Sequence, residues 1–331
     1  MRFVSRLAVV AVLACLGFAG WLVWFALTPI PLASTPLEFD IRPGLGLRGA
    51  AKEMADAGVG IAPWKFSLLG RLTGKASAIK AGSYEIEHGI TPWRLLAKLT
   101  RGDVSQAEIV LVEGRNFREL RATLDANPDL RHDTAGLSDK ELLARIGAIE
   151  KHPEGLFFPD TYLFAKQSSD VDVLRRAYRA MQKQLQWVWV NRDTELPYAS
   201  PYEALIMASI VEKETGVDAD RPLVASVFVN RLRQGMLLQT DPTVIYGLGA
   251  AFDGNLRKRD LLADTPYNTY TRLGLPPTPI AMPGRASLDA ALRPANSNLL
   301  YFVARGDGSS QFSKTLEEHN RAVAKYQKRG N

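Results

Sequence analysis

The chain has 331 residues, 46% hydrophobic and 23% charged, so it is long enough for about two domains that each bury a core. Its net charge of +6 comes from Lys and Arg spread along the chain rather than from a dense basic block, so nucleic acid is not an expected partner. The single cysteine, Cys15, excludes internal disulfides and Cys-based metal chemistry, and the scattered histidines form no ligand pattern. We expect neither a metal nor a cofactor.

An uncharged apolar run at residues 7–27 is long enough to cross a bilayer as a helix. Two arginines precede it and two tryptophans lie near its far end, so the positive-inside rule predicts a cytoplasmic stretch at 1–6. A cleaved signal peptide, or a lipoprotein site at Cys15, is the alternative, but the apolar run continues well beyond such a site. We therefore expect a single-pass anchor in the cytoplasmic (inner) membrane, with the rest of the chain periplasmic or otherwise extracytoplasmic.

Residues 28–36 are rich in proline and predict a stiff linker. A β-rich run, a glycine turn and an amphipathic helix then recur three times, at 37–57, 83–99 and 109–124. This pattern predicts a small α+β module over 37–125. The arrangement resembles the LysM-like module that precedes certain cell-wall enzymes, which implies binding of N-acetylglucosamine chains; a packing and spacer role is the alternative.

The remaining residues, 126–331, predict a mainly helical domain with a short β-hairpin near its end, so the fold class expected for the whole chain is α+β. Helices are expected at 138–149, 170–190, 200–215, about 220–233 and about 315–327, and the hairpin at 299–304 and 311–313. The aromatic stretch at 154–162 fits either a core corner or a stacking wall for sugar rings.

The helix at 200–215 carries the candidate catalytic group. Residues 204–211 are apolar apart from one serine, which predicts a buried helix. At about 100° per residue Glu212 falls on one buried stripe, while Glu203 and Glu214 fall roughly opposite. Burial without a paired cation raises the pKa of a carboxyl group and makes it a general acid. A solvated or ion-paired residue in the last turn is the alternative interpretation.

Two later stretches place polar groups among apolar ones: 238–246 and the long loop at 261–277. Asp241 before Pro242 is also typical of an ordinary helix N-cap. The motifs that carry a resemblance are ASIVEKET at 208–215, LQTDPTVIY at 238–246, YNTY at 267–270, GLPP at 274–277 and YFV at 301–303. Together they resemble the YceG-like (MltG) family of endolytic murein transglycosylases, over nearly the whole chain.

The resemblance implies a lysozyme-like catalytic domain that cleaves the MurNAc–GlcNAc bond inside peptidoglycan strands, terminating their growth beside peptidoglycan synthases. It implies that Glu212 is the single catalytic glutamate. It also implies substrate-binding roles for Gln239, Thr240, Asp241, Tyr246, Asn268 and Tyr270. In that scheme one carboxyl group protonates the glycosidic oxygen. The resulting carboxylate then deprotonates the muramic acid 6-hydroxyl, which closes a 1,6-anhydro ring. Proximity of this internal nucleophile replaces a second carboxylate.

Two other hypotheses remain open. In a hydrolase, Asp241 or Glu214 would supply a second carboxylate and the products would have reducing ends. A non-catalytic scaffold would tether glycan to the membrane through the LysM-like module, and changing Glu212 would not affect it.

Overall fold

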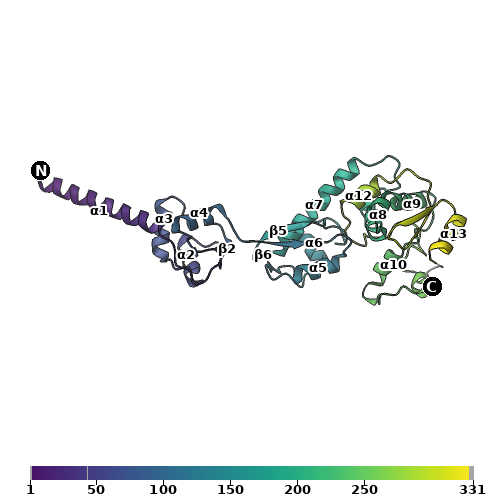
Figure 1. The fold of residues 1–331 in the computed structure, drawn as a ribbon, viewed down its shortest axis with the longest axis horizontal. Coiled ribbons are helices and arrows are strands. Elements are labelled where there is room, and N and C mark those ends of the chain that lie inside the picture. Colours follow the sequence, from purple (N-terminus) through teal and green to yellow (C-terminus); the bar gives the residue numbers. More distant parts are fainter. Residues whose placement is uncertain (1, 43, 328–331) are drawn as a thin grey trace. The chain divides into compact units, whose positions relative to one another are not determined.

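The computed structural model describes residues 2–42 and 44–327, so Met1 of the predicted cytoplasmic stretch lies outside it. The chain forms two compact units, whose elements are labelled in Figure 1. Of the described residues, the first holds 2–42 and 44–108 with the short segments 129–131 and 163–168, and the second holds 109–128, 132–162 and 169–327. The third predicted repeat therefore belongs to the second unit, in place of the predicted division after residue 125.

The first unit begins with helix α1 (Arg2–Leu27). Its other elements are β1 (Leu37–Ile41), α2 (Leu47–Asp56), α3 (Pro63–Leu72), β2 (Gly82–Ile86) and α4 (Pro92–Arg101). Strands β1 and β2 pair antiparallel, with Phe39 opposite Tyr84. Helix α3 was not predicted. It starts at Pro63, a residue type that fits the first helical position, but no polar side chain caps it. The two strands thus enclose two helices in sequence, rather than one.

Helix α1 is compatible with the predicted single-pass anchor. Its segment Val9–Leu27 has a mean hydropathy of 2.3 and is only 6% buried. The last turns, however, are part of the first unit, because Ala26 lies in its hydrophobic core. The ring of Trp21 stacks on that of Trp64, with centroids 6.0 Å apart.

The segment predicted as a linker, 28–36, packs against the first unit instead of standing free. The Ile30 side chain is 5% exposed, and its N–H donates to the carbonyl of Ile90 at 2.8 Å. The N–H of Gly60 donates to the carbonyl of Pro31 at 2.8 Å, and Leu32 forms an isolated bridge with Val59. These contacts satisfy the backbone groups that a free linker would leave to water.

Four short strands occur where the chain passes between the units: β3 (Gln106–Val110), β4 (Leu130–Arg131), β5 (Thr161–Ala165) and β6 (Ser168–Ser169). The helices of the second unit are α5 (Phe117–Asp125), α6 (Asp139–Ile146), α7 (Asp170–Val190), α8 (Pro201–Glu214), α9 (Arg221–Arg233), α10 (Asp241–Leu248), α11 (Lys258–Leu262), α12 (Arg285–Leu292) and α13 (Leu316–Tyr326). Strands β7 (Tyr301–Ala304) and β8 (Ser310–Ser313) form the predicted hairpin, with Phe302 opposite Phe312.

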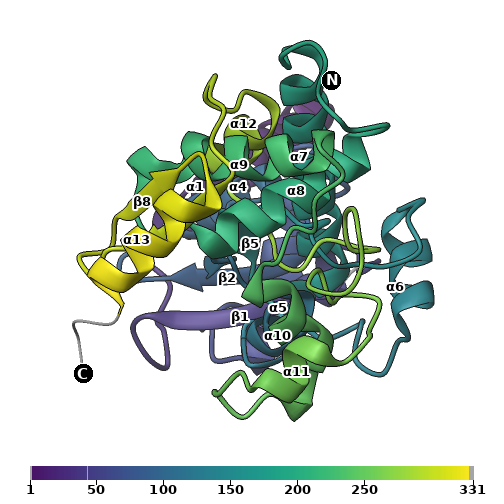
Figure 2. The same ribbon diagram turned by 90° about the vertical axis from the view of Figure 1, so that its right-hand side faces the viewer.

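Helix α8 is the centre of the second unit. Every residue from Ala204 to Val211 is buried, because α7, α9 and α12 all pack against α8 (Figure 2). Ser200 caps the helix by accepting from the N–H of Glu203 at 3.3 Å, as the sequence predicts. The hydroxyl of Ser209 donates to the carbonyl of Ile206 and accepts from the N–H of Ile280. The one polar residue of the stretch therefore binds the backbone of the loop before α12.

Candidate active site

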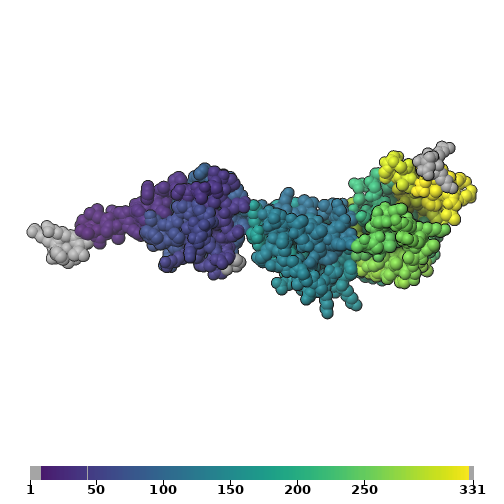
Figure 3. Space-filling model, turned by 90° about the horizontal axis from the view of Figure 1, so that it is seen from below, coloured from purple at the N-terminus to yellow at the C-terminus, as the bar shows by residue number. Residues whose placement is uncertain are grey.

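A groove of about 530 Å³ opens at the end of α8 in the second unit. One wall consists of α8, the start of α10 and the loop that follows α11; the other consists of the hairpin and α13. In Figure 3 the green surface of α10 and α11 lies beside the yellow surface of the C-terminal elements. Its polar lining residues include Glu214, Gln239, Asp241 and Tyr270. The groove therefore brings together three of the six predicted binding residues and one carboxyl group from α8.

Glu214 carries the most acid-like carboxyl group in this groove. Its Oε1 accepts a hydrogen bond from the hydroxyl of Thr240 at 2.5 Å. Burial raises the pKa of Glu214; the Thr240 hydrogen bond opposes this, and the negative charge of Asp241 adds to it. No ion pair joins Glu214 to a Lys or Arg within the described part of the chain. A carboxyl group in such surroundings retains its proton at higher pH than a free one, as a general acid requires.

The loop before α10 has a strained backbone conformation, and its Thr240 hydroxyl contacts Glu214. Gln239 has a φ of 51°, a left-handed value that costs a non-glycine residue on the order of 1 kcal/mol or more. Its N–H donates to the carbonyl of Thr269 at 3.0 Å, and the N–H of Thr240 donates to the Thr269 hydroxyl at 3.1 Å. The loop at 268–270 thus fixes the position of the Thr240 hydroxyl against the carboxyl group.

Asp241 and Tyr270 form a second polar pair in the groove. The Tyr270 hydroxyl donates to Oδ1 of Asp241 at 2.5 Å, and burial together with this contact raises the pKa of Tyr270. Beneath them, the buried guanidinium of Arg231 donates to the carbonyls of Leu238 at 2.8 Å and Leu300 at 2.7 Å. Arg231 therefore ties the two walls together through its Nε and Nη1, and it also lines the groove.

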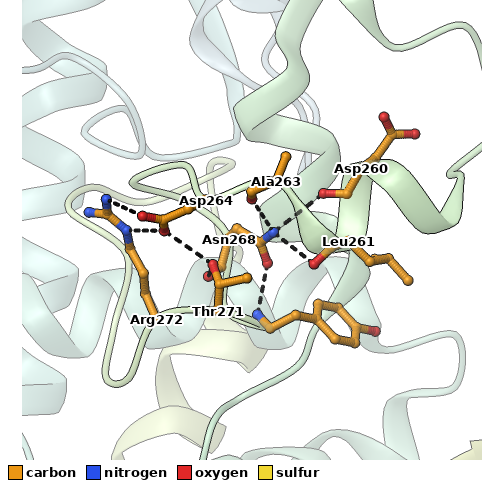
Figure 4. Close-up of polar contacts among 8 residues, drawn as sticks. Asp260, Leu261, Ala263, Asp264, Asn268, Thr271 and Arg272 are labelled. Carbon is orange, nitrogen blue, oxygen red and sulfur yellow. Dashed lines mark hydrogen bonds and ion pairs between the residues drawn. The ribbon is translucent and has the colours of Figure 1, made fainter.

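Asn268 does not line the groove, contrary to its predicted role. The side chain is fully buried, and its Nδ2 donates to the carbonyls of Asp260, Leu261 and Ala263 at 2.6–3.3 Å (Figure 4). Its Oδ1 accepts from the N–H of Tyr270 at 2.8 Å. Every polar atom of this amide is occupied, so Asn268 positions Tyr270 instead of contacting a ligand.

Tyr246 also lies away from the groove. Its hydroxyl donates to Oε2 of Glu154 at 3.0 Å, and its ring stands edge-on to Tyr267, with centroids 4.9 Å apart. Glu154 was not predicted as a titratable group of interest. It is 2% exposed, and burial raises its pKa from 4.5 to about 7. The aromatic stretch at 154–162 gave the only sequence signal for this region.

Glu212, the predicted acid, occupies a different environment from that of Glu214. Its Oε2 accepts from the N–H of Gly284 at 3.0 Å and from the hydroxyl of Ser287 at 2.6 Å, which links α8 to the start of α12. None of its hydrogen bonds in the described chain involves the 239–241 segment. Glu214, which the helical wheel places roughly opposite Glu212, is the carboxyl group of α8 that Thr240 contacts. The catalytic assignment of Glu212 stays a prediction, and the geometry favours its neighbour.

The structure of residues 2–42 and 44–327 places no three His, Cys, Asp or Glu side chains where they could share a metal ion. The groove thus offers carboxyl, hydroxyl and aromatic groups for a polar organic ligand.

The apolar N-terminal helix, the small first unit and the polar groove of the helical second unit define a class of two-unit α+β proteins. The chain belongs to the YceG-like family, whose model matches residues 39–325. An endolytic murein transglycosylase of Bacillus subtilis (strain 168) is 36% identical over 270 residues, which are 76% of this chain and 74% of that protein.

The endolytic murein transglycosylase of Streptococcus pneumoniae (strain ATCC BAA-255 / R6) is 26% identical over 283 residues. The match covers 75% of this chain and 51% of the pneumococcal protein, so the chain spans about half of that relative's length. The crystal structure of a YceG-like protein from Listeria monocytogenes is 30% identical and superimposes with a TM-score of 0.53, over 87% of this chain and 99% of that one.

Proposed function

We propose that this chain is an endolytic lytic transglycosylase that cuts peptidoglycan glycan strands. The names of its curated relatives support the substrate and the reaction. The observation that carries the mechanism is the groove itself, in which the partly buried carboxyl group of Glu214 meets Gln239, Thr240, Asp241 and Tyr270 without a paired cation. We assign the general acid to Glu214, and Glu212 remains the alternative from the sequence.

In the proposed reaction, Glu214 protonates the oxygen between MurNAc and GlcNAc as the bond to C1 breaks. Its carboxylate then takes the proton of the muramic acid 6-hydroxyl, which attacks C1 and forms the 1,6-anhydro ring. The proton returns to Glu214, so one carboxyl group completes the cycle. The internal nucleophile is already held beside C1, which substitutes for an activated water.

One observation favours a second candidate function, a hydrolase. Asp241 lines the same groove as Glu214, and a retaining or inverting glycosidase needs two carboxyl groups across the bond. The Tyr270 hydroxyl donates a hydrogen bond to Oδ1 of Asp241 and so fixes the position of this second carboxyl group in the groove. The chemistry of the new ends separates the two reactions, because only the transglycosylase leaves anhydro ends.

The remaining features of the proposal concern location. The apolar helix α1 would anchor the chain in the cytoplasmic membrane with its N-terminus inside, and the groove would act on strands outside. The two helices between β1 and β2 would form a LysM-like glycan-binding module, and termination of new strands would place the enzyme beside peptidoglycan synthases.

The test is mass spectrometry of the ends produced from purified glycan strands by the wild type, Glu214→Gln and Glu212→Gln. We expect anhydro ends from the wild type and a loss of about 10²–10⁴-fold in Glu214→Gln, the range for a general acid. Glu212→Gln retains an acceptor for Gly284 and Ser287, so it should keep most activity.

The converse pattern, with an inactive but folded Glu212→Gln and an active Glu214→Gln, would restore the assignment to Glu212. Reducing ends in place of anhydro ends would establish the hydrolase. Glycan binding by the wild type without any cleavage would leave only the scaffold.

A further inference from the structure

A second cavity of about 370 Å³ lies in the second unit, lined by the start of α5, the end of α8, and α10 with the turn that follows it. Its walls are apolar where Ile245 and Phe252 contribute, and cationic where Arg118 and Lys213 contribute. No Asp or Glu is among the residues that line it, whereas the groove described above is lined by two carboxyl groups.

The partition between the groove and this cavity is thin. Glu214 lines the groove and its neighbour Lys213 lines the second cavity; likewise Asp241 lines the groove and Pro242 the cavity. Adjacent Cα atoms are about 3.8 Å apart, so the end of α8 and the first turn of α10 each border both spaces. A branched ligand with its main chain in the groove can therefore place a substituent in the cavity.

The two cations are available to a ligand. Arg118 is exposed and makes no ion pair with another described residue. Lys213 is also exposed, and its Nζ donates to the carbonyl of Gly114 at 3.2 Å. Glu119, whose pKa is lowered in part by the charge of Lys213, is already held by Arg115 at 2.8 Å and by the N–H of Asn116.

We propose that this cavity binds a carboxylate-bearing peptide substituent of the glycan strand that is cut in the groove. The inference rests on the proposed function. Arg118 and Lys213 contact the carboxylates through charge-assisted hydrogen bonds, and the apolar wall contacts the small side chains between them. The enzyme thereby distinguishes strands that carry their peptides from strands that have lost them.

The experiment compares cleavage of two substrates, purified glycan strands with their peptides and the same strands after enzymatic removal of the peptides. It uses the full chain in detergent as wild type, as Arg118→Gln/Lys213→Gln, and as Lys258→Gln. Lys258 is an exposed cation of α11 outside both cavities, so its variant shows the effect of removing a surface cation elsewhere in the second unit. The measured quantity is the ratio of kcat/KM for peptide-bearing strands to that for stripped strands.

We expect this ratio to be well above one for the wild type and for Lys258→Gln, and to fall about tenfold or more in the double variant. Strands whose peptide carboxylates are amidated should behave like stripped strands. A wild-type ratio near one overturns the proposal, as does an unchanged ratio in the double variant or an equal loss on both substrates. If the wild type cleaves neither substrate, the proposed function itself fails, and this inference fails with it.

Discussion

Replacing Glu154 with glutamine should stabilise the protein above neutral pH. The Glu154 side chain is 2% exposed, and its oxygens accept from the N–H of Phe117 at 2.9 and 3.1 Å and from the hydroxyl of Tyr246 at 3.0 Å. Burial raises its pKa from 4.5 to about 7, although these hydrogen bonds favour the charged form. Glutamine keeps an acceptor for Phe117 and removes the charge.

The magnitude follows from the linkage between proton binding and folding. Because the pKa of Glu154 is higher in the folded protein than in the unfolded chain, its contribution is fully present below pH 4.5 and is lost as the pH rises through about 7. The interval between 4.5 and about 7, at about 1.4 kcal/mol per pH unit, gives a loss of about 3 kcal/mol by pH 8.

The assay is chemical unfolding of the wild type and Glu154→Gln between pH 5 and 8. The free energy of unfolding of the variant, relative to the wild type, should rise by about 3 kcal/mol at most over this interval. Glu317→Gln, which removes a carboxylate whose side chain is 80% exposed, should show little pH-dependent difference. A Glu154→Gln difference that is constant with pH, or that falls towards pH 8, would refute the reasoning.

Two further predictions concern packing. Asn268→Ala leaves three partly buried carbonyls without their Asn268 donor, so it should lower the free energy of unfolding by about 1–3 kcal/mol and increase protease cleavage of the loop before Tyr270. Wild-type resistance in that loop would contradict the positioning role. In Gly60→Ala the new Cβ would lie 2.5 Å from the Pro31 carbonyl oxygen, so thermal unfolding should show a loss of about 1–3 kcal/mol in the free energy of unfolding. Gly46→Ala, with open space around its Cβ, should show little loss, and equal effects of the two substitutions would argue against the clash.

Much of the helical framework could be predicted from the sequence because its local signals are strong. The capping pattern at Ser200 and the long amphipathic pattern of α7 led to helices where the structure has them. Helix α3 and helix α12 escaped prediction, because neither has a side-chain N-cap and α12 follows a glycine. Both are stabilised by packing, which a single sequence does not display.

The site was harder to predict than the framework. A helical wheel identifies a buried face only when the opposite face is solvated, and α8 is buried on all sides from Ala204 to Val211. The wheel therefore could not decide whether Glu212 or Glu214 faces the groove. That choice depends on where Thr240 and Ser287 lie, and those contacts join residues 26 and 75 positions apart in the chain. The motif points to the last turn of α8, and the tertiary contacts show that its two carboxyl groups have different surroundings.

The docking of residues 28–36 on the first unit has a mechanical consequence. Since Ala26 and Ile30 are both buried there, the apolar helix is joined to the first unit without a flexible linker between them. With α1 held in a lipid bilayer, any tilt imposed by a thinner or curved membrane would turn the whole first unit through the same angle, and lengthening the segment with glycine and serine would uncouple the two.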